Sequence, residues 1–156
     1  MHITIVAVGQ KLPAWAQTAV DDYLTRFPRD FTVIVKEVKA EARTGGKPVA
    51  QVMAAEAERI ERAVPAGDIL VAMDEHGRDM TTLDFSKKIS GWKNEGCGVT
   101  FIIGGADGLD PALKAKSRMM LRLSSMTLPH AFARVLLTEQ IYRAWSIIAN
   151  HPYHRV

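Results

Sequence analysis

Val99-Thr100-Phe101-Ile102-Ile103 runs directly into Gly104-Gly105-Ala106-Asp107-Gly108. Five consecutive β-branched or aromatic residues and then a glycine-rich turn are typical of a strand that is buried on both faces of a sheet. Glycine has no Cβ, so a backbone at this position can approach a ligand closely. The stretch predicts a strand of a parallel sheet whose carboxyl end carries either a ligand-binding turn or an ordinary tight turn.

Outward from this stretch, strand-like and helix-like segments alternate along all 156 residues. The expected strands cover residues 3–8, 31–38, 69–73, 99–103 and 121–123, and the expected helices cover 12–28, 49–64, 83–95, 111–119 and 129–150. We expect a loop over 39–47 and a turn over 74–79. The pattern predicts one α/β domain over residues 1–156, with a mostly parallel five- or six-stranded sheet flanked by helices. Ligands bind such sheets at the carboxyl ends of strands, which selects the loops after Met73, Ile103 and Leu123.

The amino-acid composition is that of an ordinary globular domain and excludes several other classes of protein. Hydrophobic residues make up 47% and charged residues 24% of the chain, as in an ordinary globular domain. The formal net charge of +3 permits a nucleic-acid partner but is weak evidence for one. Cys97 is the single cysteine, so an intrachain disulfide and a cysteine cluster for zinc are excluded, and we expect no metal. We see no signal peptide and no apolar run of about 20 residues, so we expect a cytoplasmic protein without membrane contact.

The last expected helix is apolar over most of its circumference. One narrow polar stripe contains Glu139, Arg143, Ser146 and Asn150, while Arg134 faces elsewhere. Such a helix on a small domain would expose a large apolar patch. We therefore expect one side to pack on the sheet and another to pack on a second subunit. In the helix over 49–64, by contrast, Glu56 is expected to point to water.

The two ends of this last helix carry the candidate catalytic groups. Asn150-His151-Pro152-Tyr153-His154-Arg155 follows it and brings imidazole, phenol and guanidinium groups together. Pro129-His130 begins it, and the free N–H groups of that first turn can meet an anion or the edge of a base, unless the segment is an ordinary loop. The chain lacks a dinucleotide fingerprint after its first strand and has no Gly-Lys-Ser/Thr after any glycine turn, which disfavours an oxidoreductase or a P-loop protein.

Several of these stretches together resemble one family, the ribosomal RNA large-subunit methyltransferases H of the SPOUT superfamily. The resemblance covers essentially the whole length and is most specific at the chain end. It rests on Val6-Ala7-Val8-Gly9, Lys11-Leu12-Pro13, Tyr23-x-x-Arg26-Phe27-Pro28, Ile102-Ile103-Gly104-Gly105-x-x-Gly108-Leu109, Leu123-Ser124-x-x-Thr127-Leu128-Pro129-His130, Tyr142-Arg143-Ala144-Trp145-Ser146-Ile147 and Asn150-His151-Pro152-Tyr153-His154-Arg155.

The resemblance implies a fold and an activity that periodicity alone does not. It implies a deep trefoil knot, in which the last helix threads the loop before it, and a homodimer. It implies S-adenosylmethionine as cofactor and methylation at N3 of a pseudouridine in helix 69 of 23S rRNA, on the assembled ribosome. The implied cofactor residues are Met73, Gly104, Gly105, Leu123, Ser124, Ser125, Met126, Thr127 and Leu128. Met73 stands where the family has leucine, a swap that conserves volume.

The same resemblance suggests catalytic roles. The target nitrogen is an imide N–H that must lose its proton before it attacks, and His154 is our first choice as proton acceptor, with His130 second. Arg155 and Arg143 are expected to stabilise the negative pyrimidine oxygen or a phosphate, and Tyr153 to stack on the base. The competing hypothesis is a non-enzymatic RNA-binding or ribosome-binding module that uses the chain end and the basic 39–47 loop for phosphate contacts alone.

Overall fold

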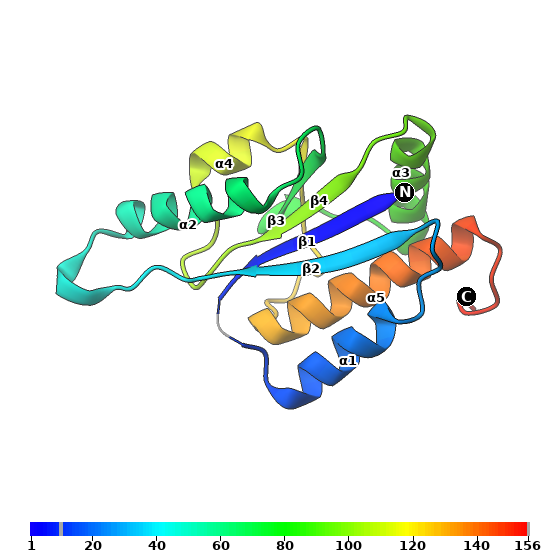
Figure 1. The fold of residues 1–156 in the computed structure, drawn as a ribbon, viewed down its shortest axis with the longest axis horizontal. Helices are drawn as coiled ribbons and strands as arrows, with labels where there is room; N and C mark the ends of the chain where they lie inside the picture. Colours follow the sequence, from blue (N-terminus) through cyan, green and yellow to red (C-terminus); the bar gives the residue numbers. More distant parts are fainter. Residues whose placement is uncertain (10, 156) are drawn as a thin grey trace.

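The computed structural model describes residues 1–9 and 11–155; Gln10 and Val156 lie outside the described residues. Its centre is a five-stranded sheet in the order β2-β1-β4-β3-β5, and every pairing is parallel (Figure 1). The strands are β1 (His2–Val8), β2 (Thr32–Val38), β3 (Ile69–Arg78), β4 (Val99–Ile103) and β5 (Met119–Leu121). The expected α/β class with a parallel sheet is confirmed, with five strands.

Helices cover both faces of the sheet. They are α1 (Ala14–Leu24), α2 (Val49–Ala63), α3 (Thr82–Asn94), α4 (Pro111–Lys116) and α5 (His130–Ile148), with one 3-10 turn at Thr44–Gly46. Figure 1 shows α2 and α4 above the sheet and α1 and α5 below it. Because successive strand residues point to opposite faces, alternate residues of β1 enter two different cores.

The two cores follow that alternation. Ile3, Ile5 and Ala7 of β1 pack with side chains of α3 and α5, whereas Val6 and Val8 pack with side chains of α2 and α4. The central strand β4 is buried at every position. A strand with no solvent-facing side needs a continuous apolar run, which is why residues 99–103 identified the fold correctly.

One predicted turn is wrong. Residues 74–79 were expected to form a turn, but β3 continues to Arg78, past a register shift after Met73. Gly77 makes this extension possible, because a Cβ there would lie 2.7 Å from the backbone of Leu121. The last strand also begins and ends two residues earlier than predicted, at Met119 and Leu121.

One polar side chain that was expected in water is buried, and so is a serine of the expected polar stripe of α5. Glu56 is 5% exposed, and its carboxylate accepts a hydrogen bond of 3.0 Å from the backbone N–H of Glu41. Ser146, a member of the polar stripe of α5, is fully buried, and its hydroxyl donates to the carbonyl of His151 over 2.9 Å. In both cases a specific hydrogen bond replaces water, which periodicity cannot detect.

The helix α5 runs along the lower face of the sheet, with its first turn at the carboxyl ends of the strands and its last turn near their amino ends (Figure 1). Within the described residues, no helix combines the length and the apolar character that a membrane span requires. The threading of the last helix through the preceding loop stays a prediction.

Candidate functional site

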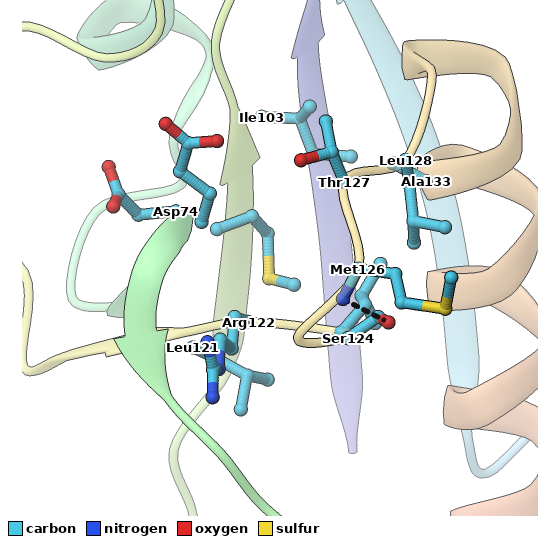
Figure 2. Close-up of a pocket in the computed structure, with 12 residues that line it drawn as sticks. Asp74, Ile103, Leu121, Arg122, Ser124, Met126, Thr127, Leu128 and Ala133 are labelled. Carbon is cyan, nitrogen blue, oxygen red and sulfur yellow. Dashed lines mark hydrogen bonds between the residues drawn. The ribbon is translucent and has the colours of Figure 1, made fainter.

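A pocket opens at the carboxyl edge of the sheet, between residues 73–75 of β3, the end of β4 and the segment that joins β5 to α5 (Figure 2). Its volume is about 150 Å³. Its walls combine apolar side chains with carboxylates and hydroxyls, and the lining residues are Met73, Asp74, Glu75, Ile103, Leu121, Arg122, Leu123, Ser124, Met126, Thr127, Leu128 and Ala133. The three loops that the sheet rule selected meet here or next to it.

The residues assigned to the cofactor from sequence gather at this pocket. Met73, Leu123, Ser124, Met126, Thr127 and Leu128 line it, whereas Gly104, Gly105 and Ser125 do not. The segment 123–128 is held by a tight local turn, in which the N–H of Met126 donates to Ser124 Oγ over 2.9 Å. This hydrogen bond fixes the backbone of an otherwise irregular segment that forms one wall of the pocket.

Gly104 follows Ile103, which lines the pocket, and Gly104 is the residue at which the chain turns sharply. A Cβ at Gly104 would approach the carbonyl carbon of Gly108 to 2.5 Å, so a larger residue would force the turn open. The turn is closed by the N–H of Gly108, which donates to the carbonyl of Gly105 over 3.0 Å. The geometry shows a tight turn here, and contact of Gly104 and Gly105 with a ligand stays a prediction.

Two carboxylates in the pocket were missed from the sequence. Asp74 and Glu75 follow Met73, and the side chain of Asp74 is only 11% exposed. Burial acts to raise the pKa of Asp74, but hydrogen bonds from the N–H of His76 and from Lys114 Nζ outweigh it, so the pKa lies below its ordinary value. An acidic pair directly after a buried strand was the available signal. The predicted turn over residues 74–79 hides this signal, because a turn would not hold the two carboxylates at the strand.

His130 lies in a neighbouring cleft of about 430 Å³, which Lys11 also lines, at the carboxyl end of β1. As the first residue of α5, it is two positions beyond Leu128 of the pocket. Its ring is half-buried, and its Nε2 accepts a hydrogen bond of 2.9 Å from Arg134 Nε. His130 therefore lies beside the pocket, and its catalytic role stays a prediction.

The chain end folds back against the last turns of α5. Asn150 adopts a left-handed conformation with φ of 55°, and the N–H of His151 donates to the carbonyl of Ser146 over 2.8 Å. This is the usual way in which a helix terminates and reverses its chain. The reversal brings His154 back to within hydrogen-bond distance of Ser146.

The hydroxyl of Ser146 fixes the proton on the His154 ring. Ser146 Oγ donates its one hydrogen to the carbonyl of His151, over 2.9 Å. It accepts from the backbone N–H of His154 at 3.2 Å and lies 2.8 Å from Nδ1 of the same residue. Because the single hydroxyl proton is already used, Nδ1 must carry the hydrogen of that contact. The Nε2 lone pair of His154 is then available to accept a proton.

Tyr153 anchors the chain end in this structure. Its hydroxyl donates to Glu139 Oε1 over 3.0 Å and accepts from the hydroxyl of Tyr23 over 3.0 Å. Burial and these two hydrogen bonds raise the pKa of Tyr153 well above its ordinary value, so the phenol stays protonated. The ring packs edge-on against Tyr142, and the guanidinium of Arg143 lies 5.0 Å above it. Stacking of Tyr153 on a base stays a prediction.

Arg143 and Arg155 differ in their surroundings. Arg143 forms a short ion pair with Glu139, whose oxygen lies 2.6 Å from its terminal nitrogen. The side chain of Arg155 is exposed, so its charge is open to a ligand. Glu139 binds both Arg143 and Tyr153, and in this way it joins the chain end to α5. Of the two arginines, Arg155 is better placed to stabilise a negative oxygen.

One chain does not bring its candidate residues together. The pocket and His130 lie at the first turn of α5, and Tyr153, His154 and Arg155 follow its last turn. Figure 1 shows the C-terminus near the last turn of α5, far from its first turn. Nineteen residues separate these ends, which corresponds to about 28 Å at 1.5 Å per residue. Within one chain, α5 therefore keeps the chain end away from the pocket.

The basic 39–47 loop is largely engaged within the chain. Arg43 pairs with Asp107 over 2.6 Å, and Lys47 pairs with Glu41 over 3.5 Å. These pairs reduce the charge that the loop can offer to phosphates. In the described part of the chain, no group of His, Cys, Asp and Glu side chains is arranged to hold a metal ion.

Comparison with known proteins gives a consistent set of relatives. A family model described as a predicted SPOUT methyltransferase matches residues 1–154. The chain is 53% identical over 156 residues to the ribosomal RNA large subunit methyltransferase H of Ralstonia pickettii, and the match covers 100% of each chain. It is 54% identical over 155 residues to the protein of that name from Bordetella avium, with 99% of each covered.

Solved structures agree with the fold. A probable methylase family protein from Haemophilus influenzae superposes with a TM-score of 0.61, covering 99% of this chain and 70% of that one. A putative methylase family protein from Neisseria gonorrhoeae gives a TM-score of 0.54, covering 90% and 81%. Both are 15% identical in sequence, so they support the architecture alone.

We predict that Ser146→Ala loosens the chain end without affecting the pocket. The substitution leaves the His151 carbonyl and two His154 donors without their partner, so we expect a loss of about 1–2 kcal/mol in the free energy of unfolding, measured with urea. Amide hydrogen exchange should accelerate at His154. Thr18→Ala removes a hydroxyl from the exposed side of α1 and is the matched control. Unchanged exchange at His154 would show that Ser146 does not hold the chain end.

Proposed function

The chain belongs to the SPOUT methyltransferase family, and we propose that it transfers a methyl group from S-adenosylmethionine to the RNA of the large ribosomal subunit. The observation that carries this proposal is the full-length identity of 53% to a large-subunit rRNA methyltransferase, together with a pocket at the strand ends. A purely RNA-binding module would leave that pocket without a role.

The pocket has the chemistry that S-adenosylmethionine requires. When bound, this cofactor supplies an electrophilic methyl group on a positively charged sulfur. The carboxylates of Asp74 and Glu75 can accept hydrogen bonds from ribose hydroxyls or from an ammonium group. Apolar side chains such as Met73, Ile103 and Leu128 offer a surface for the adenine ring. The low pKa of Asp74 keeps it ionised at neutral pH.

The proposed target is N3 of a pseudouridine in helix 69 of 23S rRNA. An imide nitrogen attacks only after it loses its proton, and the negative charge then spreads to the neighbouring oxygens. His154 takes the proton at Nε2, because Ser146 holds the Nδ1 side of the ring. Arg155 stabilises the negative oxygen through its exposed guanidinium. Arg143, paired with Glu139, supports the chain end by its position above Tyr153.

A homodimer completes the site. Because α5 separates the pocket from the chain end of the same molecule, the acceptor histidine comes from a second copy. An apolar surface suited to that contact lies on α1 and α5, where Trp15, Phe132 and Leu136 are 50%, 48% and 37% exposed. The rings of Trp15 and Phe132 are 4.9 Å apart, so they form one continuous patch. The patch is continuous with the first turn of α5, beside the pocket.

The direct test is methyl transfer from labelled S-adenosylmethionine to whole ribosomes, separate subunits and free rRNA, with mapping of the modified nucleotide. We expect incorporation at one pseudouridine and the highest rate on whole ribosomes, because a net charge of +3 gives little attraction for naked RNA. Labelling of free rRNA at the same rate would contradict the ribosome substrate, and no labelling would contradict the activity.

We predict that His154→Ala keeps the affinity for S-adenosylmethionine, measured by calorimetry, and lowers the single-turnover rate by about 100-fold or more. The rate falls because the proton acceptor is lost. The affinity is kept because His154 lies against Ser146, close to the last turn of α5, and does not line the pocket of its own chain. His2→Ala is the control, since its ring bonds Thr4 and Thr32 at the amino end of the sheet. A full rate in His154→Ala would remove this histidine from the mechanism.

We predict that Phe132→Asp converts the dimer into a monomer in light scattering and abolishes methyl transfer, because a buried carboxylate would be forced into the interface. The far-ultraviolet circular dichroism should not change. Val49→Asp places the same charge on a residue of α2 that is 52% exposed, on the other side of the sheet, and should remain dimeric and active. A dimeric, active Phe132→Asp would place the interface elsewhere.

A further inference from the structure

Arg134 is a buried arginine with few partners. It is 2% exposed, and both of its terminal nitrogens lack a hydrogen-bond partner within the described residues. Its nearest opposite charge is Glu37 of β2, at 3.5 Å, and that carboxylate is 40% exposed. Burying a guanidinium costs free energy that so sparse a set of contacts does not recover, so its presence calls for a role other than stability.

The short hydrogen bond from the Arg134 side chain goes to His130. Arg134 Nε donates to His130 Nε2 over 2.9 Å, within the first turn of α5. A guanidinium has donors and no acceptor, so Nε2 must present its lone pair to that N–H. The remaining ring proton then lies on Nδ1. Burial and the nearby charge of Arg134 lower the pKa of His130, which keeps the ring neutral.

We propose that Arg134 is a positioning residue that holds His130 as the neutral tautomer with its proton on Nδ1, and that His130 donates this proton in a hydrogen bond to an anionic oxygen of the RNA. His130 is then a hydrogen-bond donor and not a proton acceptor. The tautomer follows from contacts within one chain. The RNA contact rests in addition on the proposed function.

The surroundings of His130 suit an anionic oxygen. Its ring lines the cleft at the end of β1 together with Lys11, whose ammonium adds positive charge. Two carboxylates also line this cleft, and both are engaged: Glu41 pairs with Lys47 and Arg59, and Glu56 accepts from the N–H of Glu41. The backbone at Gly9 closes the other side, where a Cβ would lie 3.8 Å from His130 Nε2. The φ of Gly9 is 140°, a conformation that other residues rarely adopt. The cleft adjoins the pocket, because Leu128 and His130 lie in the same short segment.

The neutral rings of His130 and His154 carry their protons on the same nitrogen, Nδ1, but expose opposite sides. His130 has its Nε2 engaged and its Nδ1–H available, whereas His154 has its Nδ1 engaged and its Nε2 lone pair available. One ring can donate and the other can accept. A second copy that brings its chain end to this pocket would place both rings around one base, with a donor for the oxygen and an acceptor for the proton.

The tautomer is tested first on the unmodified protein. Long-range proton–nitrogen NMR spectra of the protein with labelled histidine distinguish the two neutral tautomers, and the His130 signals are identified by their loss in His130→Gln. We expect a protonated Nδ1 and an unprotonated Nε2 at neutral pH, and a shift toward protonated Nε2 in Arg134→Met. A protonated Nε2 in the unmodified protein would overturn the proposal, whether or not the protein methylates RNA.

The RNA contact is tested by kinetics on ribosomes. We expect Arg134→Met to lower the rate by about 10- to 100-fold per folded molecule, with Arg134→Lys partly restoring it and Arg118→Met, an exposed arginine, unchanged. A fall in kcat assigns the contact to an oxygen of the reacting base. A rise in KM with a weaker salt dependence assigns it to a phosphate. If Arg134→Met lowers the melting temperature but leaves kcat and KM unchanged, Arg134 is structural and the proposal is wrong.

Discussion

A continuous helix of nineteen residues is rigid on the scale of a small domain, and α5 therefore keeps its two ends about 28 Å apart. The rest of the functional arrangement depends on this spacing. All five strands are parallel, so their carboxyl ends meet at one edge and form the pocket there. The helix returns along the sheet and carries the chain end to the opposite edge (Figure 1). One chain therefore holds the pocket and the side chains of the chain end apart, and the proposed dimer is the arrangement that would bring them together.

The same helix carries three polar side chains that are buried among its apolar ones. Arg134, Thr138 and Ser146 are each 2% exposed or less. The hydroxyl of Thr138 donates to the carbonyl of Arg134, one turn earlier, so its hydrogen-bond partner lies within the helix. Arg134 and Ser146 instead act on histidines at the two ends of α5. Arg134 can only donate a hydrogen bond, and the hydroxyl proton of Ser146 is already used. Each residue therefore determines which ring nitrogen of its histidine carries the proton. The position of that proton determines whether the free side of the imidazole donates or accepts.

The sequence was sufficient for the strands and for most of the pocket, because both depend on local pattern. The apolar run over residues 99–103 and the strand-end rule identified the sheet and the segment 123–128. It was not sufficient for Asp74 and Glu75, because the extension of β3 depends on the close approach of Gly77 to Leu121, a contact between distant segments. Nor did it show that Glu56, Arg134 and Ser146 are buried, since their partners are backbone groups and side chains that only the folded chain brings near.

The central claim, that the pocket of one chain works with the chain end of another, is tested most directly by complementation. One chain carries Ala133→Trp, which fills the pocket and should abolish cofactor binding; the other carries His154→Ala. The two chains are co-expressed with different tags, and the heterodimer is purified through both tags. If each pocket works with the chain end of the other chain, this heterodimer has one site in which both the pocket and the chain end are intact. Our account predicts about half of the wild-type rate for this heterodimer, although each parent dimer is inactive. A heterodimer as inactive as its parents would show that pocket and chain end act within the same molecule.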